Sequence, residues 1–124
     1  MGAWGPKLYQ DDVAQDVRDE YKELLKIGLS NEEATKKLIN DNKGLIDDVD
    51  DGPIFWFALA DTQWKLGRLL PEVKDKAIQY IQDGDHLKAW SNQDPKLGLK
   101  RKAVLEELMN QLNTQMPETK KISP

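Results

Sequence analysis

Apolar residues recur at every third or fourth position along most of the chain, the spacing of helices that bury one face. The first such stripe is Val13, Val17, Tyr21 and Leu24 or Leu25. No segment alternates apolar and polar residues over the length of a strand, and only 5 Val and 4 Thr stand against 16 Leu and 7 Ile. The pattern predicts an all-α fold, a compact single-domain bundle of about five helices with an irregular N-terminal segment.

Capping residues mark the first two predicted helices. The first helix should begin near Asp11 and Asp12, whose carboxylates suit the positive end of a helix, and should end at Gly28. The run Ser30-Asn31-Glu32-Glu33 has the spacing of a capping box, in which the Ser and Glu side chains accept hydrogen bonds from each other's backbone N–H groups. We expect the second helix to begin there and to fray near residues 41–44.

The third predicted helix is apolar on every side. Gly52-Pro53 opens it, residues 54–60 carry no polar side chain, and it continues through Trp64 to a stop near Gly67. A helix of this kind is buried by neighbours on several sides. We therefore expect it to form the centre of the bundle, with Trp56 in the core.

Two further helices are predicted after the central one. The fourth should run from Pro71 to Gly84 and be followed by a short turn over residues 85–90. The last should start at Asp94-Pro95 or shortly after, and it carries the apolar residues Leu99, Val104, Leu105, Leu108, Met109 and Leu112.

The length of 124 residues fits one domain, which we divide into a helical bundle domain at 1–112 and a polar tail or truncated linker at 113–124. The absence of cysteine excludes disulfides, thiolate metal sites and cysteine nucleophiles. The longest uncharged apolar run, 52–60, is too short to span a bilayer, and residues 1–6 lack the features of a signal peptide. We expect a cytoplasmic protein with no membrane partner.

Charge is unevenly distributed along the chain, whose net charge is −4. Residues 1–60 hold 7 Lys and Arg against 13 Asp and Glu, whereas residues 61–124 hold 11 against 9. An acidic chain binds nucleic acid poorly, since that affinity comes from neutralising phosphates, so we expect no nucleic-acid partner. The acidic half favours a basic protein partner, although such charge also serves simply to keep a surface solvated.

Four carboxylates in this half, those of Asp47, Asp48, Asp50 and Asp51, are candidate binding residues. Clustered oxygen ligands can hold Ca²⁺ or Mg²⁺, but an EF-hand alignment places Val49 and Ala58 at ligand positions. Acidic residues at this position are also explained by the helix that follows, because carboxylates stabilise the positive N-terminal end of a helix. We expect no metal and no cofactor.

The chain is poor in catalytic groups. Its one histidine, His86, follows Asp85 at a position we expect to be exposed, and no nucleophile elbow or phosphate-binding loop is present. We expect no catalytic residue. Asp61 has Lys65 four residues later, which predicts a surface ion pair. A buried Asp61 would instead be a site candidate, because perturbed carboxylates gather at functional sites.

The four tryptophans are the second group of candidate binding residues. Tryptophan is common both in cores and at the energetic centres of interfaces. Trp4 and Trp90 lie in segments predicted to be irregular, and these two, together with Trp64, are the interface candidates. Trp4 can alternatively fill a pocket and fasten the start of the chain to the bundle.

Several short motifs together resemble a known family. They are MGAWG at 1–5, Asp11-Asp12, DVRDEY at 16–21, DGPIFW at 51–56 and LADTQW at 59–64. They resemble an uncharacterised bacterial family of domains of unknown function whose members begin Met-Gly-Ala-Trp-Gly, although Pro6 departs from its pattern. The resemblance implies a bacterial source and a helical domain, and supplies no activity.

These observations favour a non-catalytic protein-interaction module, for example an immunity or inhibitor protein that binds a basic toxin or nuclease. One alternative is a small metal-dependent hydrolase that uses Asp61 and nearby carboxylates. Another is an acidic nucleic-acid mimic that acts against a defence enzyme. The sequence leaves the partner's identity and the oligomeric state open. The mimic would depend on an acidic row formed by Asp11, Asp16, Asp19, Glu20 and Glu23.

Overall fold

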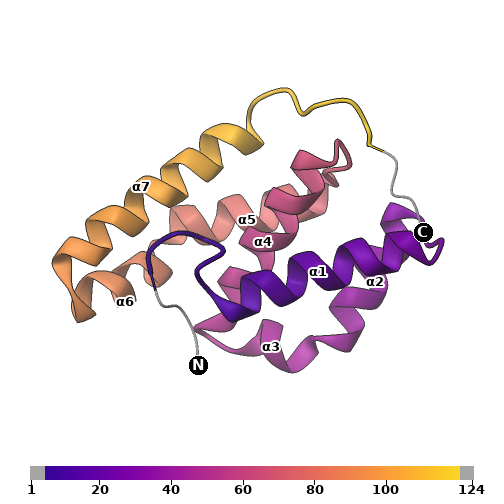
Figure 1. Ribbon diagram of the computed structural model, residues 1–124. Helices are drawn as coiled ribbons and strands as arrows, with labels where there is room; N and C mark the ends of the chain where they lie inside the picture. The colour runs from indigo at the N-terminus through magenta and orange to yellow at the C-terminus, as the bar shows by residue number, and fades with distance from the viewer. Residues whose placement is uncertain (1–4, 121–124) are drawn as a thin grey trace.

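The computed structural model describes residues 5–120, and this part of the chain is all-helical, as predicted (Figure 1). It contains seven helices rather than about five, because two short helices, α3 and α6, were not predicted. The helices are α1 (Asp12–Lys26), α2 (Asn31–Asp41), α3 (Lys43–Asp47), α4 (Asp51–Lys65), α5 (Pro71–Asp83), α6 (Asp85–Gln93) and α7 (Pro95–Leu112).

Helix α4 forms the centre of the molecule. It packs against α1, α3, α5 and α7, and every residue from Gly52 to Gln63 is buried (Figure 1). Phe55, Phe57 and Leu59 have no exposed surface. Each such side chain contributes about 2–3 kcal/mol through removal of apolar surface from water. The prediction that an all-apolar helix would be buried on several sides is confirmed, and Trp56 lies in the core as expected.

The capping signals place α1 and α2 where the sequence predicts them. The Asp11 carboxylate accepts a hydrogen bond from the Val13 N–H at 2.8 Å, so that α1 begins at the next residue. Both bonds of the capping box are present: Glu33 N–H to Ser30 Oγ at 3.1 Å, and Ser30 N–H to Glu33 Oε1 at 2.9 Å.

The region between α5 and α7 differs from the prediction. Residues 85–90, expected to form a turn, belong to helix α6, which follows α5 through Gly84 in a left-handed conformation. Leu99, one of the apolar residues of the last predicted helix, is 70% exposed. Gly98 and Arg101 occupy the inward face of α7 instead, because α6 packs against that face.

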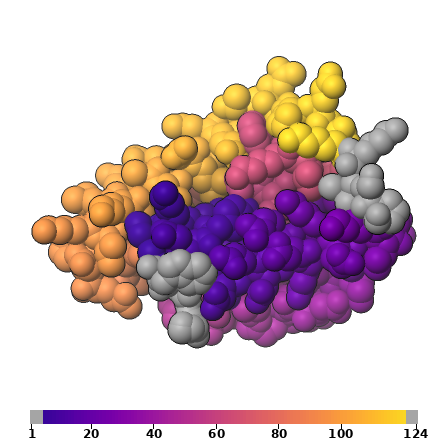
Figure 2. All heavy atoms as spheres, in the orientation of Figure 1, coloured from indigo at the N-terminus to yellow at the C-terminus, as the bar shows by residue number. Residues whose placement is uncertain are grey.

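The segment after α7, residues 113–120, returns across the molecule to the loop between α4 and α5 (Figure 1). In Figure 2 its yellow atoms lie against the pink atoms of that region. The Lys120 N–H donates to the Leu66 carbonyl at 2.9 Å, and the Thr119 hydroxyl donates to the Gly67 carbonyl at 3.0 Å. Residues 113–120 are non-helical and are held against the bundle. The assignment of 113–124 as a polar tail or truncated linker stays a prediction.

The start of the described chain also docks onto the bundle. Leu8 is buried, the Pro6 carbonyl accepts a hydrogen bond from Arg101 at 3.0 Å, and the Tyr9 carbonyl accepts one from Gln15 at 2.8 Å. These contacts agree with the expectation that the chain start is fastened to the helices. Trp4 lies outside the described residues, so the pocket expected for it stays a prediction.

Candidate functional site

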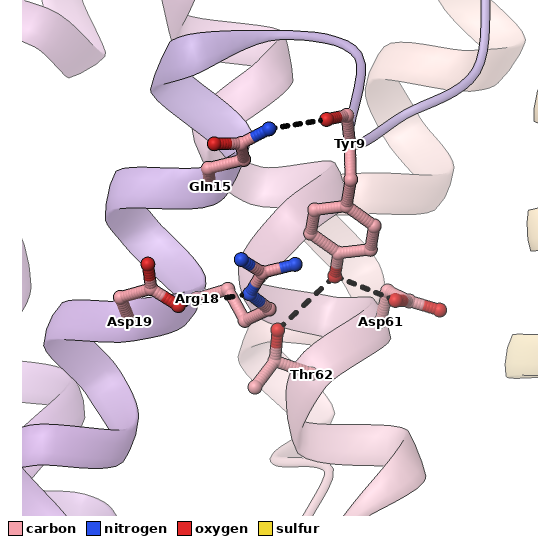
Figure 3. Close-up of polar contacts among 6 residues, drawn as sticks. All are labelled: Tyr9, Gln15, Arg18, Asp19, Asp61 and Thr62. Atoms are coloured by element: carbon pink, nitrogen blue, oxygen red, sulfur yellow. Dashed lines mark hydrogen bonds and ion pairs between the residues drawn. The ribbon is translucent and has the colours of Figure 1, made fainter.

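Asp61 is the centre of a buried polar cluster that joins three distant parts of the chain. Figure 3 shows its contact with Tyr9. Only 5% of its surface is exposed. Its Oδ2 accepts a hydrogen bond from the Tyr9 hydroxyl at 2.6 Å and lies 3.0 Å from Lys65 Nζ, and its Oδ1 accepts from Gln111 Nε2 at 2.7 Å. The predicted ion pair with Lys65 is confirmed. The prediction that this ion pair lies on the surface is wrong for the Asp61 carboxylate, because Tyr9 and Gln111 cover it.

The Tyr9 side chain links this carboxylate to two cations. Because its single hydroxyl proton is donated to Asp61, the Thr62 hydroxyl, 3.2 Å away, must donate to the Tyr9 oxygen. Burial, and then the charge of Asp61, raises the pKa of the Tyr9 phenol, which therefore stays neutral. The Arg18 guanidinium carbon lies 4.9 Å, and Lys65 Nζ 5.6 Å, from the centre of the Tyr9 ring (Figure 3 shows Arg18).

This geometry gives Asp61 a structural role, because its carboxylate joins Tyr9, Gln111 and Lys65. Both carboxylate oxygens already accept hydrogen bonds, and Lys65 balances the charge. Within residues 5–120, no group of three or more His, Asp or Glu side chains is placed to hold a metal ion. The occupied oxygens of Asp61 weigh against its use as a metal ligand.

A second buried cluster lies between α6 and α7. Arg101 has no exposed surface, and its Nε donates to His86 Nε2 at 3.1 Å. The expectation that His86 is exposed is wrong, because α6 is a helix that packs this ring against Phe57. Burial, and then the charge of Arg101, lowers the pKa of His86 to about 3, so the ring is a neutral acceptor. Burial lowers the pKa of Arg101 to about 10, although Asp11 opposes this shift.

The acidic segment, residues 47–51, joins α3 to α4. Asp48 Oδ1 accepts the N–H groups of Asp50 at 2.8 Å and Asp51 at 3.0 Å, and these bonds lower the pKa of the Asp48 carboxyl. Asp51 is half-buried, and its pKa is raised by burial and then by the neighbouring negative charges. None of the four carboxylates forms an ion pair with the described residues. Val49, between them, is 86% exposed.

The predicted binding residues do not converge on one site. Asp51 and Asp61 lie on the same helix but ten residues apart, which corresponds to roughly 15 Å along its axis. Trp64 is half-buried near Asp61, and its Nε1 donates to the Thr114 carbonyl at 3.1 Å. Trp90 lies on α6, with the Arg101 guanidinium 5.0 Å from its ring centre.

Tyr9 and Arg101 are the residues that the sequence analysis missed. Arg101 had a readable signal, since it begins the stripe 101, 105, 108 and 112 on the inward face of α7. The sequence contains no comparable signal for Tyr9, because this residue lies in an irregular segment and its partner, Asp61, is 52 residues away.

Comparison of the chain with protein-family models, with curated proteins and with solved structures finds no match. None of the helices in the described part of the chain combines the length and apolarity needed to cross a membrane. The resemblance to the bacterial family whose members begin Met-Gly-Ala-Trp-Gly therefore stays a prediction.

Proposed function

We propose that the chain is a non-catalytic protein-interaction module that binds a basic protein partner through the acidic segment. The observation that carries the proposal is the composition and exposure of that segment: carboxylates without cationic partners in the described structure flank, in the sequence, one exposed apolar residue, Val49. Charge of one sign steers an oppositely charged partner, and an apolar residue at the centre adds contact area that excludes water.

Helix capping accounts for only part of this segment. Asp48 caps the first turn of α4 through its side chain. The side chains of Asp47 and Asp50 are exposed and make no hydrogen bond within residues 5–120. Burial, and then the negative charge of its neighbours, raises the pKa of Asp51. A basic partner would relieve the repulsion among these carboxylates.

The acidic surface extends from this segment toward α1. Asn42, which precedes α3, donates to the Glu20 carboxylate at 3.4 Å and so connects α1 to the start of α3. Asp16 and Glu20 are exposed and occupy the same face of α1, one turn apart. We propose that a partner seated on residues 47–51 also contacts these carboxylates.

The two alternatives have less support. The hydrogen bonds to both oxygens of Asp61 weigh against a metal-dependent hydrolase. The acidic row needed by a nucleic-acid mimic is interrupted, because Asp11 is buried as a helix cap and Asp19 is paired with Arg18 at 2.9 Å. An immunity or inhibitor protein for a basic toxin is one concrete form of the proposed module.

The test is affinity capture from a lysate of the source organism with three forms of the chain. The test variant is Asp47→Asn, Asp48→Asn, Asp50→Asn, in which the asparagine that replaces Asp48 can still cap α4. The control variant, Asp83→Asn, Glu106→Gln, Glu107→Gln, neutralises three exposed acids elsewhere and so has the same net charge. We expect a protein that is retained by the unmodified chain and the control and lost by the test variant. Equal retention by all three forms would contradict the proposal.

A further inference from the structure

A cavity of about 370 Å³ lies at the opposite end of α4 from the acidic segment. This volume is within the range of small-molecule pockets. The N-terminal segment, α1, α4 and the C-terminal segment all contribute to its walls. Its polar lining consists of Tyr9, Arg18, Lys22, Thr62, Lys65 and Lys120, and Leu66 completes it.

Four cationic side chains around one cavity are an unusual feature of an acidic protein. Arg18 and Lys22 are separated by one turn of α1, whereas Lys65 comes from α4 and Lys120 from the C-terminal segment. Asp19 pairs with Arg18 and Asp61 pairs with Lys65. Lys22 and Lys120 form no ion pair within the described residues, so four cations and two carboxylates leave an excess of two positive charges.

The polar cluster around Asp61 holds the walls of this cavity in place. The hydrogen bond from Tyr9 to Asp61 fixes the phenol ring, and the Arg18 and Lys65 cations both lie over that ring. Because these side chains are already ordered, a ligand that binds here causes little further loss of side-chain conformational entropy. Lys120 is positioned by its own backbone, whose N–H donates to Leu66 and whose carbonyl accepts from Arg68 at 2.9 Å.

We propose that this cavity binds the phosphoryl group of a phosphorylated small molecule. A phosphoryl group carries nearly two negative charges at neutral pH and three acceptor oxygens. It therefore matches both the charge excess and the approach of donors from several directions. Guanidinium and ammonium groups form strong charge-assisted hydrogen bonds to such oxygens. A single carboxylate would leave part of the positive charge unbalanced. The cavity also exceeds the size of a phosphate ion, which leaves room for the remainder of the molecule.

The inference is independent of the proposed protein partner, because the two surfaces lie at opposite ends of α4. The probe is inorganic pyrophosphate, titrated into the full chain at low salt by isothermal calorimetry, with malonate as a dicarboxylate whose two negative charges equal the charge excess of the cavity. We expect saturable binding of pyrophosphate with a Kd below about 1 mM, and weaker binding of malonate.

The decisive variant is Lys22→Gln, Lys120→Gln, since neither side chain makes a hydrogen bond or ion pair within residues 5–120 and the fold should be unaffected. The matched control is Lys36→Gln, Lys102→Gln, which removes two exposed cations elsewhere. We expect the first pair to weaken pyrophosphate binding by about tenfold or more and the control pair to leave it within about twofold. Absence of saturable binding, equal weakening by both pairs, or malonate binding as tight as pyrophosphate would each overturn the proposal.

Discussion

At the scale of single residues, two buried polar contacts fasten the start of the described chain to the bundle. Tyr9 donates to Asp61 on α4, and Arg101 on α7 donates to His86 and to the Pro6 carbonyl. Buried polar groups of this kind stabilise a fold only while each has its partner, so removal of one partner costs more than the bond itself contributed. The contribution of each contact to the free energy of unfolding can be measured with single substitutions.

The first prediction concerns the Tyr9 hydroxyl. Tyr9→Phe leaves the ring in place but removes a hydrogen bond to a buried carboxylate, and we expect it to lower the free energy of unfolding by about 1.5–3 kcal/mol. The control is Tyr80→Phe, since the Tyr80 hydroxyl makes no hydrogen bond within residues 5–120 and the ring is also half-buried. Urea denaturation provides both values. Equal losses in the two variants would show that the bond to Asp61 has no special weight.

The second prediction concerns the pH dependence of stability. The pKa of His86 is about 3 in the folded chain against 6.5 in an unfolded one, so between these values the unfolded state binds a proton that the folded state does not. The contribution of His86 to stability is therefore complete above pH 6.5 and declines as the pH falls toward 3, by up to about 1.4 kcal/mol per pH unit.

His86→Gln isolates this contribution, because glutamine retains an acceptor for Arg101 and does not titrate. We expect the unfolding free energy of the unmodified chain to fall more steeply between pH 6.5 and pH 4 than that of the variant. Carboxylates titrate in both proteins and cancel in the difference. Parallel pH profiles would mean that His86 gains a proton as easily in the folded chain as in the unfolded one.

At the scale of elements, the boundaries that depend on local chemistry were predictable. Asp11, the Ser30–Glu33 box, Pro71 with Gly84, and Asp94-Pro95 all mark helix ends that the structure confirms. Burial of α4 was predictable from its composition. The two short helices were not, because five and nine residues contain too few turns for a periodic signal.

The contacts that build the cavity were not predictable from the sequence either. The C-terminal segment is held through backbone carbonyls of Leu66 and Gly67, and every residue type has these groups. Gly67 is the one residue in this contact whose type is required by the close approach of the C-terminal segment. A Cβ atom there would overlap the Pro117 carbonyl oxygen and lie 2.7 Å from the Glu118 backbone.

The third prediction follows from this close approach. Gly67→Ala should displace residues 113–120 and should also strain a backbone with φ of +70°. The control is Gly84→Ala, which has a similar φ of +82° but open space around the added methyl group. We expect both variants to lose about 1 kcal/mol from strain, and only Gly67→Ala to expose Lys120 to rapid cleavage by trypsin. Equal cleavage in the two variants would show that the packing at Gly67 does not hold the segment.

At the scale of the whole molecule, charge is separated along α4. The acidic segment lies at the N-terminal end of this helix, where carboxylates suit the positive end of the dipole, and the cationic cavity lies at the C-terminal end. The division between acidic residues 1–60 and the remainder was visible in the sequence. The cavity was not, since two of its cations come from the acidic half and two from segments near residues 65 and 120.

We propose that a basic protein partner is recruited through residues 47–51. The most direct measurement is the association rate constant of the captured partner at low and at physiological salt, for the unmodified chain and for Asp47→Asn, Asp48→Asn, Asp50→Asn. We predict a rate that is fast at low salt, falls as salt rises, and is about tenfold or more slower for the variant at low salt, with a weaker salt dependence. An association rate that changes with neither the substitutions nor the salt concentration would contradict the claim.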